Sequence, residues 1–128
     1  MEFKELMAAR RSVRRFSDRA VPREVVDRIL AEALKAPSSR NSRSTRFLVV
    51  DRHDLIARMA GMRDYGSAFM EGAPLAVVVL GDTAASDLWR VNAAISATVL
   101  QLACVDEGLA EGEQVVTAGQ QKLRDGMK

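Results

Sequence analysis

The chain has 128 residues, of which 48% are hydrophobic and 28% charged, and its formal net charge is +2. This length fits one domain with one core, and the composition is that of a globular protein rather than a disordered or fibrous one. No apolar run approaches the roughly 20 residues that cross a membrane, and none near the start has the pattern of a secretory leader. We therefore expect a cytoplasmic protein with no membrane partner. The single cysteine, Cys104, excludes an intrachain disulfide, and its apolar neighbours predict a buried, unreactive thiol.

Basic residues are concentrated in the first third of the chain. Residues 1–46 hold 12 lysines and arginines against 6 acidic residues, whereas the remainder holds 7 against 11. This imbalance suggests an anionic partner for the first third, although a solvated helical face gives the same pattern. A nucleic acid is not expected there, because aromatic residues are not interleaved with the basic ones and the whole chain is close to neutral.

The first predicted element is a short helix over residues 2–9, which leads into an arginine-rich segment. Pro22 predicts the start of a second helix, since proline is favoured in the first turn, and apolar residues then recur at helical spacing over residues 25–34. Pro37 ends this helix because the residue before a proline is pushed out of the helical region. The polar residues 38–42 predict a loop.

Strands and shorter helices are predicted in the middle of the chain. The continuous apolar run Phe47–Val50 predicts a buried strand, and residues 54–60 and 64–72 predict short helices. Residues 75–80 form the stronger strand pattern. They are apolar at every position, which predicts that both faces of that strand are covered.

The longest helix is predicted over residues 86–107, with Gly108 as its C-cap. From residue 91 to residue 105 its only polar residues are Asn92, Ser96, Thr98 and Gln101. A helix that is apolar nearly all round is buried in a core or at a subunit interface, and a chain of this size can hardly surround it, so we expect a homodimer. Residues 110–128 are weakly patterned and predict either a short strand and helix or a mobile tail.

The order of these elements is typical of a mixed α/β or α+β sheet layered with helices. With either class, α/β or α+β, we expect a small β-sheet flanked by helices, with the long helix buried at a dimer interface.

The first candidate binding element consists of Arg10, Arg11, Ser12 and Arg14. Arginine supplies forked, charge-assisted donors that suit a phosphate, and the serine hydroxyl adds a further donor. These side chains can surround one phosphate if the backbone turns at this point. The alternative interpretation is a solvated surface or a salt-bridged helix end.

The second candidate element is the loop that begins at Pro37 and continues through Ser38, Ser39, Arg40 and Asn41. It is rich in small donors and acceptors, and such a loop can place backbone amides against the polar edge of a heterocycle. The alternative interpretation is an ordinary connection between a helix and a strand.

Together the two elements resemble the flavin-binding signature of the nitroreductase family. That family has an Arg-Arg-Ser-x-Arg element, matched here by residues 10–14, and then an Ala-Pro-Ser-Ser/Gly-x-Asn-Ser-Gln-Pro-Trp-type element, matched by residues 36–42. The resemblance implies that the first element holds the phosphate and ribityl hydroxyls of FMN. It implies that residues 37–41 lie against the isoalloxazine ring, often that of the flavin held by the opposite subunit.

The resemblance also implies an activity. It is that of an FMN-dependent oxidoreductase, which passes electrons from NAD(P)H to a small acceptor such as a nitroaromatic or a quinone. The cofactor carries such chemistry, so no side-chain acid or nucleophile is required. We expect residues 1–109 to form the nitroreductase-like flavin-binding domain and residues 110–128 to form an atypical C-terminal tail of a short family member.

The chain departs from the family pattern in two places. Arg43, Ser44 and Thr45 stand where the family usually has Gln-Pro-Trp, and the elements that usually follow the long helix are not recognisable after residue 109. Both departures concern the substrate side of the flavin. They leave open an alternative, in which a shortened family member binds flavin or another phosphate ligand without turnover.

The sequence offers little for other chemistries. One histidine and one cysteine cannot form a zinc site, and no glycine-rich phosphate loop of the Walker or Rossmann type is present. His53 lies between acidic residues and is expected at the surface. Trp89 and Tyr65 are expected to pack against the protein rather than to stack on a ligand.

Overall fold

The computed structural model describes residues 1–109 and 115–118. Its helices are α1 (Phe3–Ala9), α2 (Arg23–Ala33), α3 (His53–Ala60) and α4 (Trp89–Asp106), with two 3-10 helices, η1 (Ser39–Asn41) and η2 (Ala68–Gly72). The strands are β1 (Thr45–Val50), β2 (Leu75–Gly81) and β3 (Val115–Ala118). This is the predicted α+β arrangement of a small sheet with flanking helices. Apart from β3, the predicted C-terminal tail lies outside the described residues.

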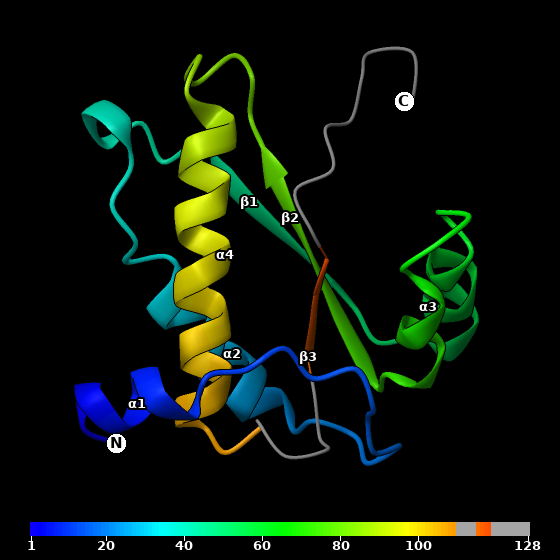
Figure 1. Ribbon diagram of the computed structural model, residues 1–128. Coiled ribbons are helices and arrows are strands. Elements are labelled where there is room, and N and C mark those ends of the chain that lie inside the picture. Colours follow the sequence, from blue (N-terminus) through cyan, green and yellow to red (C-terminus); the bar gives the residue numbers. More distant parts are fainter. Residues whose placement is uncertain (110–114, 119–128) are drawn as a thin grey trace.

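The three strands form one sheet in the order β1-β2-β3. β1 and β2 are antiparallel, with Phe47 opposite Val79 and Val49 opposite Val77, whereas β2 and β3 are parallel. Figure 1 shows α4 running along the sheet with α2 beside its lower half, while α3 lies apart from them, where β1 ends and β2 begins. The helices therefore form one long layer on one face and a shorter group at one end of the other.

β2 lies at the centre of the fold because alternate residues face two different clusters. Leu75, Val77 and Val79 pack against α2 and α4 in the larger apolar cluster. Ala76 and Val78 belong to a second cluster with α3 and η2. Side chains of a strand point alternately to its two faces, so an all-apolar strand is stable only when both faces are covered. The prediction for this strand is confirmed.

The prediction of a fully buried strand at residues 47–50 is wrong for part of that strand. Val50 is buried, but the side chain of Leu48 is 53% exposed. Among the described strands β1 pairs with β2 alone, so it forms one edge of the sheet, and the second cluster covers only the end of its outer face. A continuous apolar run does not distinguish an edge strand from a central one.

α4 confirms the predicted long helix and its predicted end. The N–H of Leu109 donates to the carbonyl of Cys104 and the N–H of Gly108 donates to the carbonyl of Val105, both at 3.0 Å, which is the Schellman pattern. Gly108 has a φ of 80°, a conformation that costs glycine nothing. One side of α4 is buried. The other side carries an apolar stripe of exposed residues, Leu88, Val91 and Ile95.

The segment between α1 and α2 is held to the rest of the fold by Phe16. Its ring lies 6.0 Å from that of Phe69, and both belong to the second cluster. On the other side of α1, the N-terminal ammonium of Met1 pairs with Asp106 at 3.2 Å. The N-terminal residues therefore lie across the C-terminal end of α4 (Figure 1).

Candidate functional site

The arginine element lies on an exposed, non-helical segment that starts where α1 ends. Arg10 is the C-cap of α1 and has an extended backbone, with φ −62° and ψ 128°. Arg10, Arg11, Ser12 and Arg14 all have exposed side chains. Within residues 1–109 and 115–118, the guanidinium groups of Arg10 and Arg14 form neither ion pairs nor hydrogen bonds. At least two strong cationic donors of this element are thus available to an anion.

The serine-rich loop has an unusual backbone. Arg40, Asn41 and Arg43 have φ values of 53°, 52° and 49°, in the left-handed region. This region costs a residue with a side chain about 1 kcal/mol or more, and such residues cluster at functional sites when the surroundings hold them in place. Three of them within four positions mark this loop as a segment that the rest of the fold constrains.

Hydrogen bonds within the loop account for part of this constraint. The N–H of Asn41 donates to the carbonyl of Ser38 at 3.0 Å, and the N–H of Arg43 donates to the hydroxyl of Ser38 at 2.9 Å. The side chain of Arg46 donates to the carbonyl of Arg43 at 2.6 Å. Ser38 thus closes the loop on itself, as a serine in a tight turn commonly does.

The remaining constraint comes from Asn92 in the first turns of α4. Its Oδ1 accepts from the N–H of Ser39 at 2.9 Å. Its Nδ2 donates to the hydroxyls of Ser44 at 2.9 Å and Ser42 at 3.2 Å. Asn92 is 1% exposed and Ser44 is fully buried, so the bond between them lies out of water, whereas the bonds to Ser39 and Ser42 are partly buried. One buried amide therefore connects the helix to three residues of the loop.

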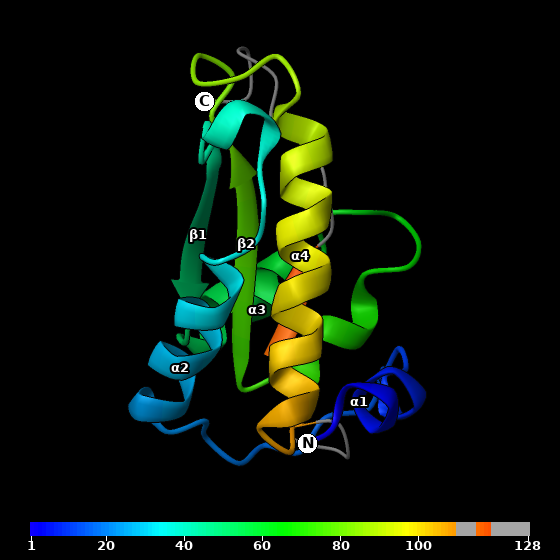
Figure 2. The same ribbon diagram turned by 90° about the vertical axis from the view of Figure 1, so that its left-hand side faces the viewer.

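The two candidate elements do not meet within one chain. The loop lies beside the first turns of α4, and the N-terminal residues lie beside its last turn (Figure 2). Asn92 touches the loop and Asp106 touches Met1, and 14 residues of helix between them at 1.5 Å each span about 20 Å. A single chain presents the phosphate-type donors at one end of this helix and the loop at the other.

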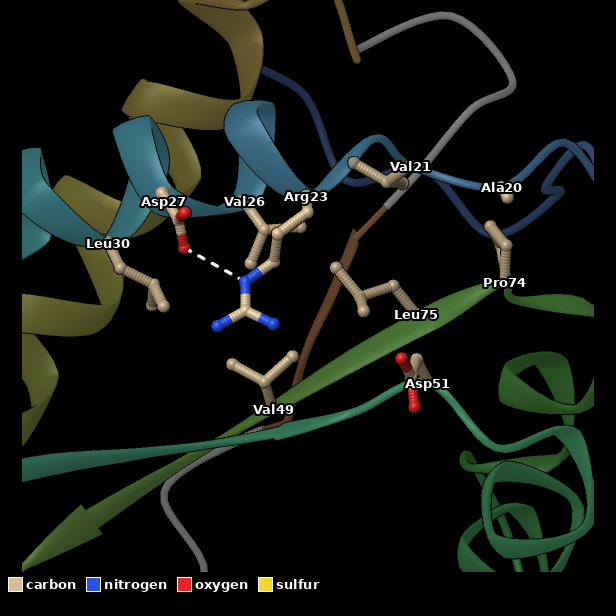
Figure 3. A pocket seen from close by; sticks show the side chains of 10 residues that line it. All are labelled: Ala20, Val21, Arg23, Val26, Asp27, Leu30, Val49, Asp51, Pro74 and Leu75. Carbon is tan, nitrogen blue, oxygen red and sulfur yellow. Dashed lines mark hydrogen bonds and ion pairs between the residues drawn. The ribbon is translucent and has the colours of Figure 1, made fainter.

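A pocket of about 550 Å³ lies between α2 and the start of β2 (Figure 3). Aliphatic side chains such as Val26, Val49 and Leu75 form much of its wall. Arg23 and Asp27 at its rim pair with each other at 3.1 Å and are largely exposed. None of the predicted site residues lines this pocket.

A second pocket, of about 230 Å³, adjoins the loop. Ser38 and Arg43 line it together with Thr45 of β1 and Ser96 of α4. The hydroxyl of Ser96 donates to that of Thr45 at 3.2 Å on one side of this pocket. Of the nine predicted site residues, Ser38 alone lines either pocket.

The groups with shifted pKa values lie away from both elements. The side-chain hydrogen bond from Arg28 lowers the pKa of Glu107 and raises that of Arg28, with Nη2 2.8 Å from Oε1. Burial raises the pKa of the Cys104 thiol to about 12. His53 is exposed, as predicted. Among the described residues no group of three or more histidine, cysteine or acidic side chains is arranged to hold a metal, and no helix is long and apolar enough to span a membrane.

Trp89 and Tyr65, which the sequence predicts to pack against the protein, differ in their exposure. Trp89 packs against the backbone of Gly81 so closely that a Cβ there would overlap its ring, and the guanidinium of Arg90 lies 5.1 Å from the ring centre. The packing prediction for Trp89 is confirmed. For Tyr65 it is wrong, because this side chain is 87% exposed on the connection after α3.

Sequence reasoning missed Asn92 and Ser44 as parts of the loop structure. An asparagine within an otherwise apolar helix was the available signal, since a buried amide needs partners for its oxygen and its nitrogen. The sequence does not say which partners these are, because they lie 48 to 53 positions away.

Comparison with known proteins relates this chain to one protein family. Residues 7–62 match the family model described as the nitroreductase family. A protein of Methanothermobacter thermautotrophicus described as an NADH dehydrogenase/NAD(P)H nitroreductase is 31% identical over 112 residues, 85% of this chain and 58% of the relative. A solved FMN-dependent nitroreductase of Clostridium difficile superimposes with a TM-score of 0.78 at 36% identity, over 80% of this chain and 60% of the other.

A further solved structure, a nitroreductase of Desulfovibrio desulfuricans described as a complex with FMN, gives a TM-score of 0.73 at 29% identity, over 81% of this chain and 62% of the other. The fold and the sequence thus agree on one class of α+β protein. The chain belongs to the nitroreductase family. It spans about three fifths of the length of the relatives it matches.

Proposed function

We propose that this chain is the FMN-binding part of a homodimeric oxidoreductase. In this proposal, electrons pass from NAD(P)H to a small acceptor such as a nitroaromatic or a quinone. The observation that carries it is the pair of elements at the two ends of α4, an exposed arginine segment and a constrained serine loop. Family membership and the FMN named for two solved relatives support the choice of cofactor.

The arginine element fits the phosphate end of FMN. The Arg10 and Arg14 side chains are exposed and make no polar contact with any described residue, so an incoming phosphate does not have to displace an existing ion pair. The Ser12 hydroxyl, also exposed, supplies a neutral donor beside them. We assign Arg10, Arg11, Ser12 and Arg14 to the phosphate and the ribityl hydroxyls, where forked guanidinium donors are suited to the phosphate oxygens.

The loop from Pro37 to Asn41 fits the ring end. Ser38 and Ser39 are half-buried at its base, whereas Arg40 and Asn41 are exposed at its tip. The left-handed backbone fixes which polar atoms of the loop face outward before any ligand arrives. We assign Pro37, Ser38, Ser39, Arg40 and Asn41 to the edge of the isoalloxazine ring.

A second copy of the chain brings the two ends together. In a two-fold dimer every contact between residue i of one protomer and residue j of its partner occurs again as j with i, so the phosphate end of each protomer can face the ring end of the other. The exposed apolar stripe of Leu88, Val91 and Ile95 on α4 gives such a dimer an apolar contact. Residues 1–109 would then carry both halves of the flavin site, and residues 110–128 would be the atypical C-terminal tail, from which residues 115–118 add β3 to the sheet beside β2.

Bound FMN would supply hydride and single-electron transfer, while the protein orients it and sets its electrostatic environment. Positive charge on Arg10 and Arg14 favours the anion of the reduced flavin over its neutral form. The loop excludes water from one edge of the ring. We propose no side-chain acid or base, because the cofactor carries this chemistry and the assigned residues are arginines, serines, a proline and an asparagine.

The test is a titration of the purified protein with FMN, followed by the addition of NADH or NADPH. We expect the flavin spectrum to shift on binding, the dissociation constant to rise at least about tenfold when Arg10 and Arg14 are both changed to alanine, and the bound flavin to bleach with the reductant. Arg63→Ala is the control, since it removes one positive charge of the same kind from an exposed position outside both elements.

The outcomes separate the candidate functions. Flavin that binds and is reduced by the nicotinamide, then reoxidised by a nitroaromatic or a quinone, supports the oxidoreductase. Flavin that binds but is not reduced identifies the alternative, a chain that holds flavin or another phosphate ligand without turnover. Equal FMN affinity in the double arginine variant and in Arg63→Ala contradicts the assignment of the arginine element.

A further inference from the structure

Asn92 stands apart from the other polar residues of α4. It is 1% exposed, and every side-chain hydrogen bond that it makes goes to the loop that follows α2 rather than to its own helix. Thr98 shows the ordinary behaviour, with its hydroxyl donating to the carbonyl of Ala94 one turn earlier. The side-chain amide of Asn92 therefore forms hydrogen bonds with the loop and not with α4.

The positions of its three partners show what it holds. Ser39 lies immediately before the left-handed residues Arg40 and Asn41, and Ser42 and Ser44 lie on either side of the left-handed Arg43. Asn92 thus contacts the loop at points that flank each left-handed stretch. A segment with an unfavourable backbone persists only where its neighbours fix it, and beside the bonds of Ser38 and Arg46 the buried side chain of Asn92 does so from α4.

Asparagine suits this position because it carries an acceptor and a two-proton donor on one planar group. Oδ1 takes the backbone N–H of Ser39, which would otherwise lose its partner. Nδ2 reaches two hydroxyls at once. An aliphatic residue of similar size would fill the space but would leave three polar groups of the loop without these partners, at a cost that opening the loop to water would relieve.

We propose that Asn92 is the positioning residue that keeps the serine loop in its left-handed conformation and thereby presents it to the flavin ring. The second half of this statement rests on the proposed function. The first half does not, because it concerns only how the loop is held. The two halves are therefore tested by different measurements.

The loop itself is tested by limited proteolysis without FMN. Trypsin cleaves after arginine, and Arg40 and Arg43 are exposed in the loop. Asn92→Leu is expected to speed cleavage at these two sites by about tenfold or more, since cleavage follows the population of the open loop and each buried hydrogen bond lost contributes to opening. Cleavage after Arg63, on a different connection, provides the internal reference for general unfolding.

Two further variants make the test specific. Ser96→Ala removes a buried hydroxyl one turn along the same face of α4, but its partner is Thr45 in β1, so the loop cleavage rate should stay at the wild-type value. Asn92→Asp keeps the acceptor for Ser39, and the hydroxyls of Ser42 and Ser44 can rotate to donate to the second oxygen. We expect it to restore slow cleavage and so to separate the loss of hydrogen bonds from the loss of packing.

Flavin affinity tests the second half. Asn92→Leu should weaken FMN binding by about tenfold or more while Ser96→Ala leaves it unchanged, with thermal midpoints showing that both variants remain folded. Loop cleavage after Asn92→Leu at the wild-type rate, or a rate that rises only in step with cleavage after Arg63, overturns the proposal. Should the wild-type chain bind no FMN, the proposed function fails, whereas faster loop cleavage still establishes the role of Asn92.

Discussion

The thiol of Cys104 shows how a single side chain responds to the larger cluster. It is 5% exposed, and loss of hydration is the main reason that its pKa rises to about 12, with the nearby charge of Glu107 acting in the same direction. The thiolate is the reactive form of cysteine, so this thiol is almost entirely in its inert form at neutral pH. The prediction of a buried, unreactive cysteine is confirmed.

We therefore expect an aromatic disulfide reagent to leave the folded chain unmodified at mildly alkaline pH. The same reagent in guanidinium chloride should titrate one thiol per chain, which controls for oxidation of the sample. Rapid labelling of the folded protein would show that the α2–α4 cluster opens far more often than its packing implies.

Among elements, α2 and α4 are joined at their exposed edge by Arg28 and Glu107. The two Arg28 donors Nε and Nη2 lie 3.0 Å from Oε2 and 2.8 Å from Oε1 of Glu107, a bidentate geometry that favours the carboxylate. Because the pKa of Glu107 is lower in the folded chain than its ordinary value, the pair contributes stability at neutral pH. That contribution is lost as the pH falls below the ordinary glutamate pKa of about 4.3 and through the lower folded value.

We expect Glu107→Gln to lower the thermal midpoint at neutral pH by a few degrees at most, since solvent screens a pair at this exposure. The difference from wild type should vanish as the pH is lowered past the titration of the carboxyl. Glu32→Gln is the matched control, because Glu32 lies in the last turn of α2, its partner Lys35 follows directly after that helix, and the pair does not join two elements. A difference that persists at acid pH would show that the Glu107 side chain acts through packing rather than charge.

Elements differ in how well the sequence predicts them. Pro22 and the helical spacing after it predict α2, and Gly108 predicts the end of α4, because both signals act within a few residues. The exposure of Leu48 could not be predicted in this way, since it depends on which strand lies at the sheet edge. The left-handed loop could not be predicted either, because Arg40 and Arg43 are not residues that favour such a backbone, and Asn92 lies some 50 positions away.

At the scale of the whole molecule, the sequence identifies both halves of a candidate site but not their separation. The arginine element and the loop lie within about two dozen residues of each other, yet α2, which lies between them in the sequence, carries the chain to the far end of α4. Proximity in sequence therefore gave no indication of distance in space. The nitroreductase resemblance, which anticipates a ring reached from the opposite subunit, agrees with this separation.

In the proposed dimer, where each flavin site takes its arginines from one chain and its loop from the other, two variants with different defects can complement each other. A chain with Arg10 and Arg14 changed to alanine keeps its loop, and a chain with Asn92→Leu keeps its arginines. In a mixed dimer, one site has both the altered arginines and the altered loop, and the other site has neither. Co-expression should therefore restore flavin binding that neither variant shows alone. Each variant expressed by itself is the control, and a mixture that stays colourless would show that each chain holds its flavin alone. Restoration would mean that the unit able to hold a flavin is the pair of chains and not the single chain, so that one intact site in each pair is enough to colour the protein.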